Sequence, residues 1–282
     1  MKIFRTIKNL RNELAHFRRV GKTIGLVPTM GYFHGGHLSL MDVARKDSDV
    51  VVVSLFVNPT QFGPNEDLER YPRDFERDRQ LAEERGVDII FYPDVKEMYP
   101  EPFYTYVYTE KLSKVLCGAS RPIHFRGVTT IVAKLFNIVQ PDIAVFGQKD
   151  AQQAIIIKQM VKDLNFPIKI IVAPIIREKD GLAMSSRNKY LSFEEREQAV
   201  VINRALTEAY KKVQSGVKNA KDIEYLIRKI INEATLAKIE YIKIVDDSTL
   251  ENVESIEAGT FAAVAVFFGK TRLIDNVILL KE

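Results

Sequence analysis

Residues 23–46 read TIGLVPTMGYFHGGHLSLMDVARK. A short apolar run at Thr23–Val27 leads into a glycine-rich loop, and a helical pattern follows over Leu38–Lys46. A short apolar run bounded by turn residues is typical of a buried strand. The order of strand, glycine loop and helix is typical of a parallel α/β sheet, which binds ligands beyond the carboxyl ends of its strands. The stretch therefore predicts an α/β fold with a ligand-binding loop at residues 28–37.

The same alternation continues through the first two-thirds of the chain. Strands alternating with helices predict a Rossmann-like parallel sheet with helices on both faces. Further strands are predicted at Val50–Val57, Val87–Tyr92, Asp142–Phe146 and Ile168–Val172. Further helices are predicted at Asp74–Arg85, Val128–Val139 and Ala151–Leu164.

The order of elements changes near Tyr190, where helices come first and strands follow. Ser192 with Glu195 three residues later predicts a capping box that opens a helix running to about Gln214. Helices followed by strands indicate a smaller α+β domain. We expect a first domain at 1–180 and a second at 181–282, joined within 175–188. The other elements expected in the second domain are a helix at 218–234 and strands at 239–245, 261–268 and 277–280.

Composition excludes several classes of protein. The 282 residues include 41 Lys and Arg against 37 Asp and Glu, so the net charge of +4 does not indicate a nucleic-acid-binding protein. A single cysteine, Cys117, rules out an internal disulfide and agrees with a reducing compartment. No apolar run approaches the ~18 residues of a membrane span. The charged N-terminal segment does not resemble a secretory signal. We therefore expect a cytoplasmic protein with neither a nucleic-acid nor a membrane partner.

The loop PTMGYFHGGH holds two of the four histidines, His34 and His37, among three glycines. Glycines let the backbone approach a ligand, and the N-terminus of the following helix offers N–H donors to an anion. The imidazole of His37 adds a donor that can be charged near neutral pH. Position alone leaves a tight surface turn with solvated histidines as an equal alternative. A zinc site is disfavoured, because neither a cysteine nor an acid accompanies the HxxH spacing.

Two further loops follow strands of the same predicted sheet. Asn58 and Gln61 are uncharged amides, which suit a hydroxy acid better than a phosphate. Lys149 stands at a strand end, where it can meet a phosphate as a point charge, and Gln153 follows one turn into the helix. Each loop alone also fits an ordinary turn or a solvated helix start.

A fourth polar segment, Asp180–Asn188, reads DGLAMSSRN. It combines two hydroxyls, a guanidinium and an amide, and arginine can bind phosphate oxygens through two parallel hydrogen bonds. Taken alone, it also fits a polar linker. The four loops together indicate a site for a phosphate-bearing ligand and a small acid.

These motifs resemble a known family. PTMGYFHGGH, NPTQF, KLFNIVQPDIAVFGQKDAQQ and DGLAMSSRN occur in the order found in the pantoate–β-alanine ligases, or pantothenate synthetases. The resemblance covers the first domain and the domain junction. It also extends to the wider group of nucleotidyl-transferring α/β proteins that includes class I aminoacyl-tRNA synthetases. His34–His37 is similar to the HIGH signature of that group, and Met184–Arg187 is similar to its KMSKS loop.

The resemblance implies a ligase of pantothenate biosynthesis, the route to coenzyme A. Pantoate would attack the α-phosphate of ATP, giving pantoyl adenylate and diphosphate, and β-alanine would then displace AMP. The protein would position reactants and stabilise charge without a nucleophile of its own. ATP with Mg²⁺, a cytoplasmic homodimer and a second domain acting as a lid are further implications.

The resemblance also assigns roles to individual residues. Gln61 and Gln153 would bind pantoate, and Gln61 would also border β-alanine. Asp78 would lie near magnesium. His37, as the proton donor, with His34, Lys149 and Arg187 would be catalytic. The ATP site would comprise Met30, Gly31, Tyr32, Phe33, His34, Gly35, Gly36, His37, Gly147, Gln148, Lys149, Asp150, Ile176, Met184, Ser185, Ser186 and Arg187.

Two positions depart from the family pattern. Ile123 stands where the family usually has glycine, and a β-branched residue does not easily replace a glycine that needs positive φ. This leaves the roles of Arg121 and His124 open. Phe33 stands where leucine is commoner, a change that we expect packing to absorb.

Three other functions remain as alternatives. A nucleotidyltransferase that stops after nucleotide transfer would keep the nucleotide in its product. A nucleic-acid-binding module and a noncatalytic nucleotide sensor are the others. The modest charge and the absence of tryptophan disfavour the module, and the intact motifs disfavour the sensor.

Overall fold

The computed structural model describes residues 1–64 and 66–281. The chain forms two compact units, each built from several segments. Unit 1 consists of Met1–Lys114, Gly118–Gly147 and Ile156–Pro174. Unit 2 consists of Val115–Cys117, Gln148–Ile155 and the chain from Ile175 onward. The predicted division at 180/181 and the predicted lid role of the second domain stay predictions.

Unit 1 is the expected parallel α/β sheet. Within the described part of the chain, six strands lie in the order β1-β4-β3-β2-β5-β6, and every neighbouring pair is parallel. Their bounds are β1 Lys2–Phe4, β2 Ile24–Thr29, β3 Val50–Leu55, β4 Ile89–Phe91, β5 Ile143–Gly147 and β6 Lys169–Ala173. The central strand β3 is buried along its whole length, as its run of β-branched valines predicts.

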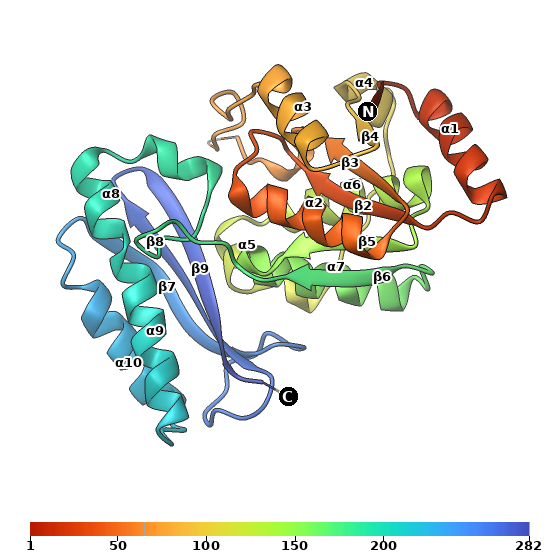
Figure 1. Cartoon of the computed structure of the whole chain (residues 1–282). Helices are drawn as coiled ribbons and strands as arrows, with labels where there is room; N and C mark the ends of the chain where they lie inside the picture. Colours follow the sequence, from red (N-terminus) through yellow and green to blue (C-terminus); the bar gives the residue numbers. More distant parts are fainter. Residues whose placement is uncertain (65, 282) are drawn as a thin grey trace. The chain divides into compact units, whose positions relative to one another are not determined.

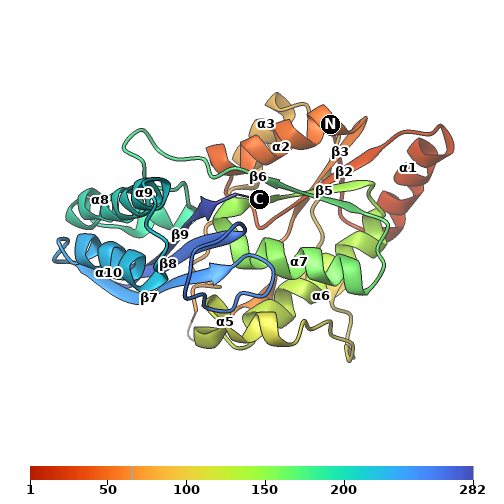
Figure 2. The ribbon, with the colours of Figure 1, turned by 90° about the horizontal axis from the view of Figure 1, so that it is seen from below.

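Helices cover both faces of this sheet. Figure 2 shows α2 and α3 on one face and α6 and α7 on the other. Because each crossover helix returns the chain to the same edge, the loops after β2, β3 and β5 follow the carboxyl ends of adjacent parallel strands. The helices are α1 Ile7–Arg19, α2 Gly35–Asp47, α3 Phe75–Glu84, α4 Val95–Met98, α5 Cys117–Ser120, α6 His124–Val139 and α7 Ala151–Asp163, with short 3-10 turns η1 Pro59–Gln61, η2 Lys111–Lys114 and η3 Gln148–Asp150.

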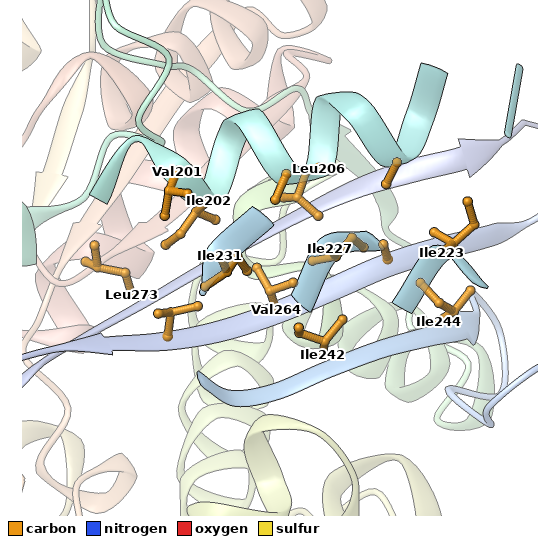
Figure 3. Close-up of a cluster of buried hydrophobic side chains, with 14 of the residues drawn as sticks. Val201, Ile202, Leu206, Ile223, Ile227, Ile231, Ile242, Ile244, Val264 and Leu273 are labelled. Atoms are coloured by element: carbon orange, nitrogen blue, oxygen red, sulfur yellow. The ribbon is translucent and has the colours of Figure 1, made fainter. Parts of the chain in front are cut away.

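Unit 2 is an antiparallel sheet covered by helices. Its strands lie in the order β7-β8-β9, with bounds Ala237–Asp246, Thr260–Phe268 and Thr271–Leu280. The turn η4 Ser186–Tyr190 leads into α8 Phe193–Ala199, α9 Val201–Gln214 and α10 Ala220–Ile231. In Figure 1, α9 and α10 lie side by side against the three strands. Figure 3 shows their apolar side chains meeting the sheet, with Ile202, Leu206, Ile227 and Ile231 directed at Ile242 and Val264.

In unit 2, the bounds of two predicted elements differ from those in the structure. The helix expected from Ser192 to Gln214 is two helices, interrupted at Val200, which keeps helical dihedrals (φ −63°, ψ −17°). The last strand, expected at 277–280, begins earlier, at Thr271. The apolar pattern did not indicate its first half, because Arg272 and Asp275 interrupt that pattern and are paired with opposite charges only in the folded chain. The expected capping box of Ser192 and Glu195 is present.

In the described ranges, no helix is both long and apolar enough to cross a bilayer.

Candidate active site

The glycine-rich turn after β2 opens helix α2 with two histidines. His34 is the N-cap residue, and its Nδ1 accepts a hydrogen bond from the Gly36 N–H at 3.1 Å. The His34 N–H donates in turn to Nδ1 of His37 at 3.3 Å. The two rings lie 4.1 Å apart between centroids. Because each Nδ1 accepts from the backbone, the ring proton of each neutral imidazole lies on Nε2. The turn thus carries two Nε2–H donors at a helix N-terminus.

The side chain of Asp78 fixes the shape of this turn by binding backbone N–H groups of the turn. It lies in α3 and is 1% exposed, and its carboxylate accepts from the Tyr32 N–H at 2.6 Å and the Phe33 N–H at 2.7 Å. Gly31 has φ +85°, and a Cβ there would lie 2.9 Å from Oδ2 of Asp78, so the turn requires glycine at this position. Burial raises the pKa of Asp78, while the Phe33 and Tyr32 hydrogen bonds oppose that rise.

These contacts make Asp78 a structural anchor of the histidine turn. Each of its carboxylate oxygens accepts one backbone N–H. Among residues 1–64 and 66–281, no group of three or more His, Cys, Asp or Glu side chains is arranged to hold a metal ion. The place of Asp78 near magnesium stays a prediction.

Gln61 lies at the end of η1, after β3, and is 7% exposed. Its Nε2 lies 3.1 Å from Sδ of Met30, so these two predicted site residues are in contact. The carbonyl oxygen of Gln61 lies 2.9 Å from Nδ1 of His124 and accepts a hydrogen bond from Arg121. The backbone and side chain of Gln61 are therefore both held within unit 1.

The Arg121–Phe125 turn closes without strain. Ile123 has φ −94° and ψ −13°, so this position needs no residue with positive φ and the expected penalty for replacing glycine is absent. Arg121 pairs with Glu66, a half-buried pair. Burial opposes ionisation of Glu66, but the hydrogen bond and charge of Arg121 hold the pKa of Glu66 below its ordinary value. Phe33, the second departure, is fully buried in the core of unit 1.

In unit 2, the backbone of η3 is held by a residue of β9. Nδ2 of Asn276 donates to the carbonyls of Gln148 at 2.9 Å and Lys149 at 3.1 Å, and Oδ1 of Asn276 accepts from Nε2 of Gln148. Asn276 is 4% exposed. This contact fixes the turn from which the Lys149 ammonium extends.

The DGLAMSSRN segment folds back on itself beside the same strand. The Met184 N–H donates to the carbonyl of Ile176 at 3.0 Å, so these two predicted ATP contacts are neighbours. Arg177 forms a two-pronged ion pair with the buried Asp275, at 2.6 and 3.1 Å. Ser185 caps η4 by accepting from the Arg187 N–H at 3.3 Å. The segment is thus a built turn and not a loose linker.

Two of the predicted phosphate contacts line one small cavity. Lys149 and Ser185 lie on its wall together with Asn188 and Asp275. The cavity therefore lies between η3 and the Ser185–Arg187 turn, both of which belong to unit 2. Its other lining residues are Leu182, Ala183, Ile202, Leu273 and Ile274.

Helix α7 presents two neighbouring glutamines differently. Gln152 is 7% exposed, accepts from the Cys117 N–H at 3.0 Å and donates to the Val115 carbonyl at 2.7 Å. Gln153, the predicted pantoate contact, is half-buried. Gln152 therefore attaches the Val115–Cys117 segment to unit 2.

Each unit carries part of the predicted set. The sequence patterns did not indicate Asn276, Arg177 or Asp275, because these residues hold the turns of the site through contacts distant in sequence. Unit 1 holds Met30, Gly31, Tyr32, Phe33, His34, Gly35, Gly36, His37, Gln61, Asp78 and Gly147, and unit 2 holds Gln148, Lys149, Asp150, Gln153, Ile176, Met184, Ser185, Ser186 and Arg187.

Comparison with known proteins gives one consistent result. The family model described as Pantoate-beta-alanine ligase matches residues 2–278. A pantothenate synthetase of Acetivibrio thermocellus is 57% identical over 280 residues, 99% of either chain. The crystal structure of pantothenate synthetase from Thermus thermophilus has a TM-score of 0.95 and 44% identity, covering 99% of this chain and 100% of that one.

A third relative was solved with small molecules bound. The pantoate-beta-alanine ligase of Francisella tularensis, complexed with beta-gamma ATP and beta-alanine, has a TM-score of 0.82 and 37% identity, covering 99% of this chain and 98% of that one. The motifs, the parallel sheet and full-length matches to sequences and structures agree, and the chain belongs to the pantoate-beta-alanine ligase family.

Proposed function

We infer that the chain condenses (R)-pantoate with β-alanine to give (R)-pantothenate, converting ATP to AMP and diphosphate. The enzyme is thus a carbon–nitrogen ligase of pantothenate biosynthesis. Of the structural observations, the histidine turn carries the most weight. It places two imidazole rings, whose Nδ1 atoms accept from backbone N–H groups, at one helix N-terminus, where the positive end of the helix dipole favours an anionic phosphate chain.

In the first step, a carboxylate oxygen of pantoate attacks the α-phosphorus of ATP. The new bond is an acyl phosphate anhydride, and the bond to the β-phosphate breaks, releasing diphosphate. We propose that His34, His37, Lys149 and Arg187 stabilise the charge that moves onto the departing diphosphate, because donors aimed at developing charge lower the barrier most. The contacts proposed for the rest of the ATP site are those that the motifs imply.

In the second step, the amine of β-alanine attacks the acyl carbon of the adenylate. The carbon–nitrogen bond forms, the bond to the AMP oxygen breaks, and the nitrogen loses a proton. No protein nucleophile is needed, because AMP is already a good leaving group. We assign Gln61 and Gln153 to pantoate and Gln61 to the edge of the β-alanine position. The Francisella tularensis complex with beta-gamma ATP and beta-alanine supports ATP and β-alanine as ligands here.

Mg²⁺ is proposed as the ion that accompanies ATP. Phosphate oxygens and water satisfy magnesium with few protein ligands, and Asp78, whose carboxylate oxygens each accept one backbone N–H, is the protein group that we propose near the ion. A cytoplasmic location and a homodimer are proposed on family grounds. Sedimentation equilibrium at micromolar concentration tests the dimer, and a monomeric mass would reject it.

We also propose that unit 2 acts as a lid. The support is that Lys149 and the Ser185–Arg187 turn belong to the same compact unit, so a movement of that unit would carry both. Hydrogen exchange in residues 182–190 should slow when ATP is added. Unchanged exchange at saturating ATP would reject the lid.

The reaction itself is tested by omitting substrates one at a time. ATP and pantoate alone should release no more than about one equivalent of diphosphate per active site, and continuous AMP release should require β-alanine as well. Continuous nucleotide consumption without β-alanine, or a product that keeps the nucleotide, would instead identify a simple nucleotidyltransferase.

A further inference from the structure

A chain of buried polar side chains stands behind Gln61 in unit 1. The hydroxyl of Tyr99 donates to Oδ1 of Asn58 at 2.8 Å, and Nδ2 of Asn58 donates to Oε1 of Gln61 at 3.1 Å. The exposed fractions are 8% for Tyr99, 1% for Asn58 and 7% for Gln61. Buried amides and hydroxyls with complete partners hold one orientation, because every alternative leaves a polar group unsatisfied.

The orientation of the Asn58 amide is set by backbone groups at both ends. Its Nδ2 lies 3.1 Å from the carbonyl oxygen of Gly127, which can only accept. Its Oδ1 accepts from the Thr60 N–H at 3.4 Å, and a backbone N–H can only donate. A rotation of the amide by 180° would place donor against donor and acceptor against acceptor. The assignment of oxygen and nitrogen in Asn58 is therefore fixed by chemistry.

The Asn58 orientation determines that of Gln61. The remaining hydrogen of Nδ2 faces Gln61, so Gln61 must present Oε1 to it and turn Nε2 the other way. Nε2 then lies 3.1 Å from Sδ of Met30, a weak acceptor that leaves most of its donor capacity unused. Gln61 is thus prepared to donate, and an anionic or hydroxyl oxygen is the group that suits it.

Two side-chain hydroxyls donate to Oδ1 of Asn58, that of Tyr99 at 2.8 Å and that of Thr60 at 2.9 Å. The ring of Tyr99 is held against Phe56 and Phe103, with centroids 6.3 and 5.0 Å away, and its hydroxyl also lies 3.2 Å from Oγ1 of Thr60. Burial raises the pKa of Tyr99 to about 12. The hydroxyl therefore remains a protonated donor throughout the pH range in which the enzyme works.

We propose that Tyr99 is a positioning residue for pantoate recognition: its hydroxyl restrains the Asn58 amide in the orientation that the backbone selects, and Asn58 in turn holds the Gln61 amide with Nε2–H directed at an oxygen of pantoate. The proposal rests on the proposed function, in which Gln61 binds pantoate. Tyr99 itself does not touch the substrate. Its hydroxyl reaches the site through two hydrogen bonds.

The test replaces Tyr99 with phenylalanine, which keeps the ring packing and removes one hydrogen bond. A neutral hydrogen bond corresponds to about a fivefold change, so the KM for pantoate should rise about fivefold or more in Y99F. The KM values for ATP and β-alanine should stay within about twofold. Tyr92→Phe is the matched control, because its ring also stacks in unit 1, 4.4 Å from Phe75, and its substitution should leave all three KM values unchanged.

A double-mutant cycle separates positioning from general stability. Gln61→Met keeps the length of the side chain and removes its amide, and pantoate binding to each variant is measured by calorimetry. If Tyr99 acts through Gln61, Tyr99→Phe should weaken pantoate binding in the parent and change it less than about 1.5-fold in the Gln61→Met background. Equal losses in both backgrounds, or equal losses for pantoate and ATP in Y99F, would overturn the proposal.

The same measurements distinguish two kinds of failure. Unchanged pantoate binding in Gln61→Met removes Gln61 from the proposed function, and the Tyr99 proposal falls with it. Weakened binding in Gln61→Met together with unchanged binding in Y99F rejects the positioning role of Tyr99 alone. Circular dichroism of each variant confirms that loss of binding is not loss of fold.

Discussion

In each histidine of the turn, one ring nitrogen supports the fold. Nδ1 of His34 and Nδ1 of His37 accept from backbone N–H groups, so the proton of each neutral ring lies on Nε2, the atom that the proposed function uses. The capping box is unusual in using two imidazoles, where serine or threonine with glutamate is the common pair. A single substitution can therefore separate the two duties of His37.

His37→Asn should retain the cap and lose the catalytic donor. The Oδ1 of asparagine can accept from the His34 N–H as Nδ1 does, but asparagine carries nothing in the place of Nε2–H. Diphosphate release with ATP and pantoate should fall by roughly two to three orders of magnitude, the scale for one transition-state donor. His37→Ala should lose the same activity and in addition about 1 kcal/mol of stability, because the His34 N–H loses its acceptor. Parent rates of diphosphate release in either variant would remove His37 from the first step.

Residues that follow strands could be predicted from the sequence, and residues that act through distant contacts could not. His37, Gln61 and Lys149 stand beyond strand ends, where a parallel sheet binds ligands, so position and residue type together indicated them. Tyr99 lies 41 positions from Asn58 in the chain, and no local pattern joins the two. The hold of Asp78 on the histidine turn could not be predicted either, because it depends on the positive φ at Gly31 and Tyr32, which turns two backbone N–H groups onto the carboxylate.

At the scale of elements, helix α6 and the turn η1 meet through a glycine. A Cβ on Gly127 would lie 2.4 Å from the carbonyl oxygen of Thr60 and 2.5 Å from the backbone nitrogen of Gln61. Real Cβ atoms do not approach backbone this closely, so the absence of a side chain lets the helix support the loop that carries Gln61.

Gly127→Ala should displace η1 and weaken pantoate use. The added methyl meets the backbone of η1, and overpacking of this kind costs about 1–3 kcal/mol in the free energy of unfolding. We expect a rise in the pantoate KM with a smaller change in the ATP KM, measured with the folded variant below its melting temperature. Gly147→Ala is the control for stability, because its Cβ would lie an ordinary 3.9 Å from Leu40. Parent stability and parent pantoate KM in Gly127→Ala would show that η1 adjusts freely.

Element prediction worked where burial and periodicity agreed. β3 and β8 are almost wholly buried, and their apolar runs were recognised without help from neighbours. Strand β9 alternates apolar residues with Arg272, Asp275 and Asn276, and its polar residues are satisfied by ion pairs and hydrogen bonds that only the folded chain provides. The first part of β9 could therefore not be read from hydrophobicity.

At the scale of the whole molecule, the compact units do not follow the sequence continuously. Residues 148–155 lie between two strands of the parallel sheet in sequence, yet they belong to unit 2. The Asn276 contacts with Gln148 and Lys149, and the Gln152 contacts with Cys117 and Val115, are the bonds that hold these segments there. No composition shift marks them, so the sequence predicted one simple boundary. Lys149 therefore belongs to the same compact unit as the Ser185–Arg187 turn, which holds other predicted phosphate contacts.

The core of unit 2, however, is continuous in sequence. Every buried member of its apolar cluster lies between Leu182 and Leu279, and α9 and α10 cover one face of the sheet with these side chains (Figure 3). A fragment of residues 175–282 therefore contains this whole cluster and loses the contacts to 115–117 and 148–155, among them the hydrogen bonds of Asn276 with Gln148 and Lys149.

This fragment should fold on its own, with a free energy of unfolding of a few kcal/mol, because the apolar burial that drives folding is retained. The measurement is urea unfolding followed by circular dichroism, where we expect one cooperative transition and no turnover of ATP. The control is the fragment with Val264→Asp, which places a charge in the cluster and should abolish the transition. A gradual, noncooperative change in the unmodified fragment would show that residues 148–155 complete the core, and that the two units fold only together.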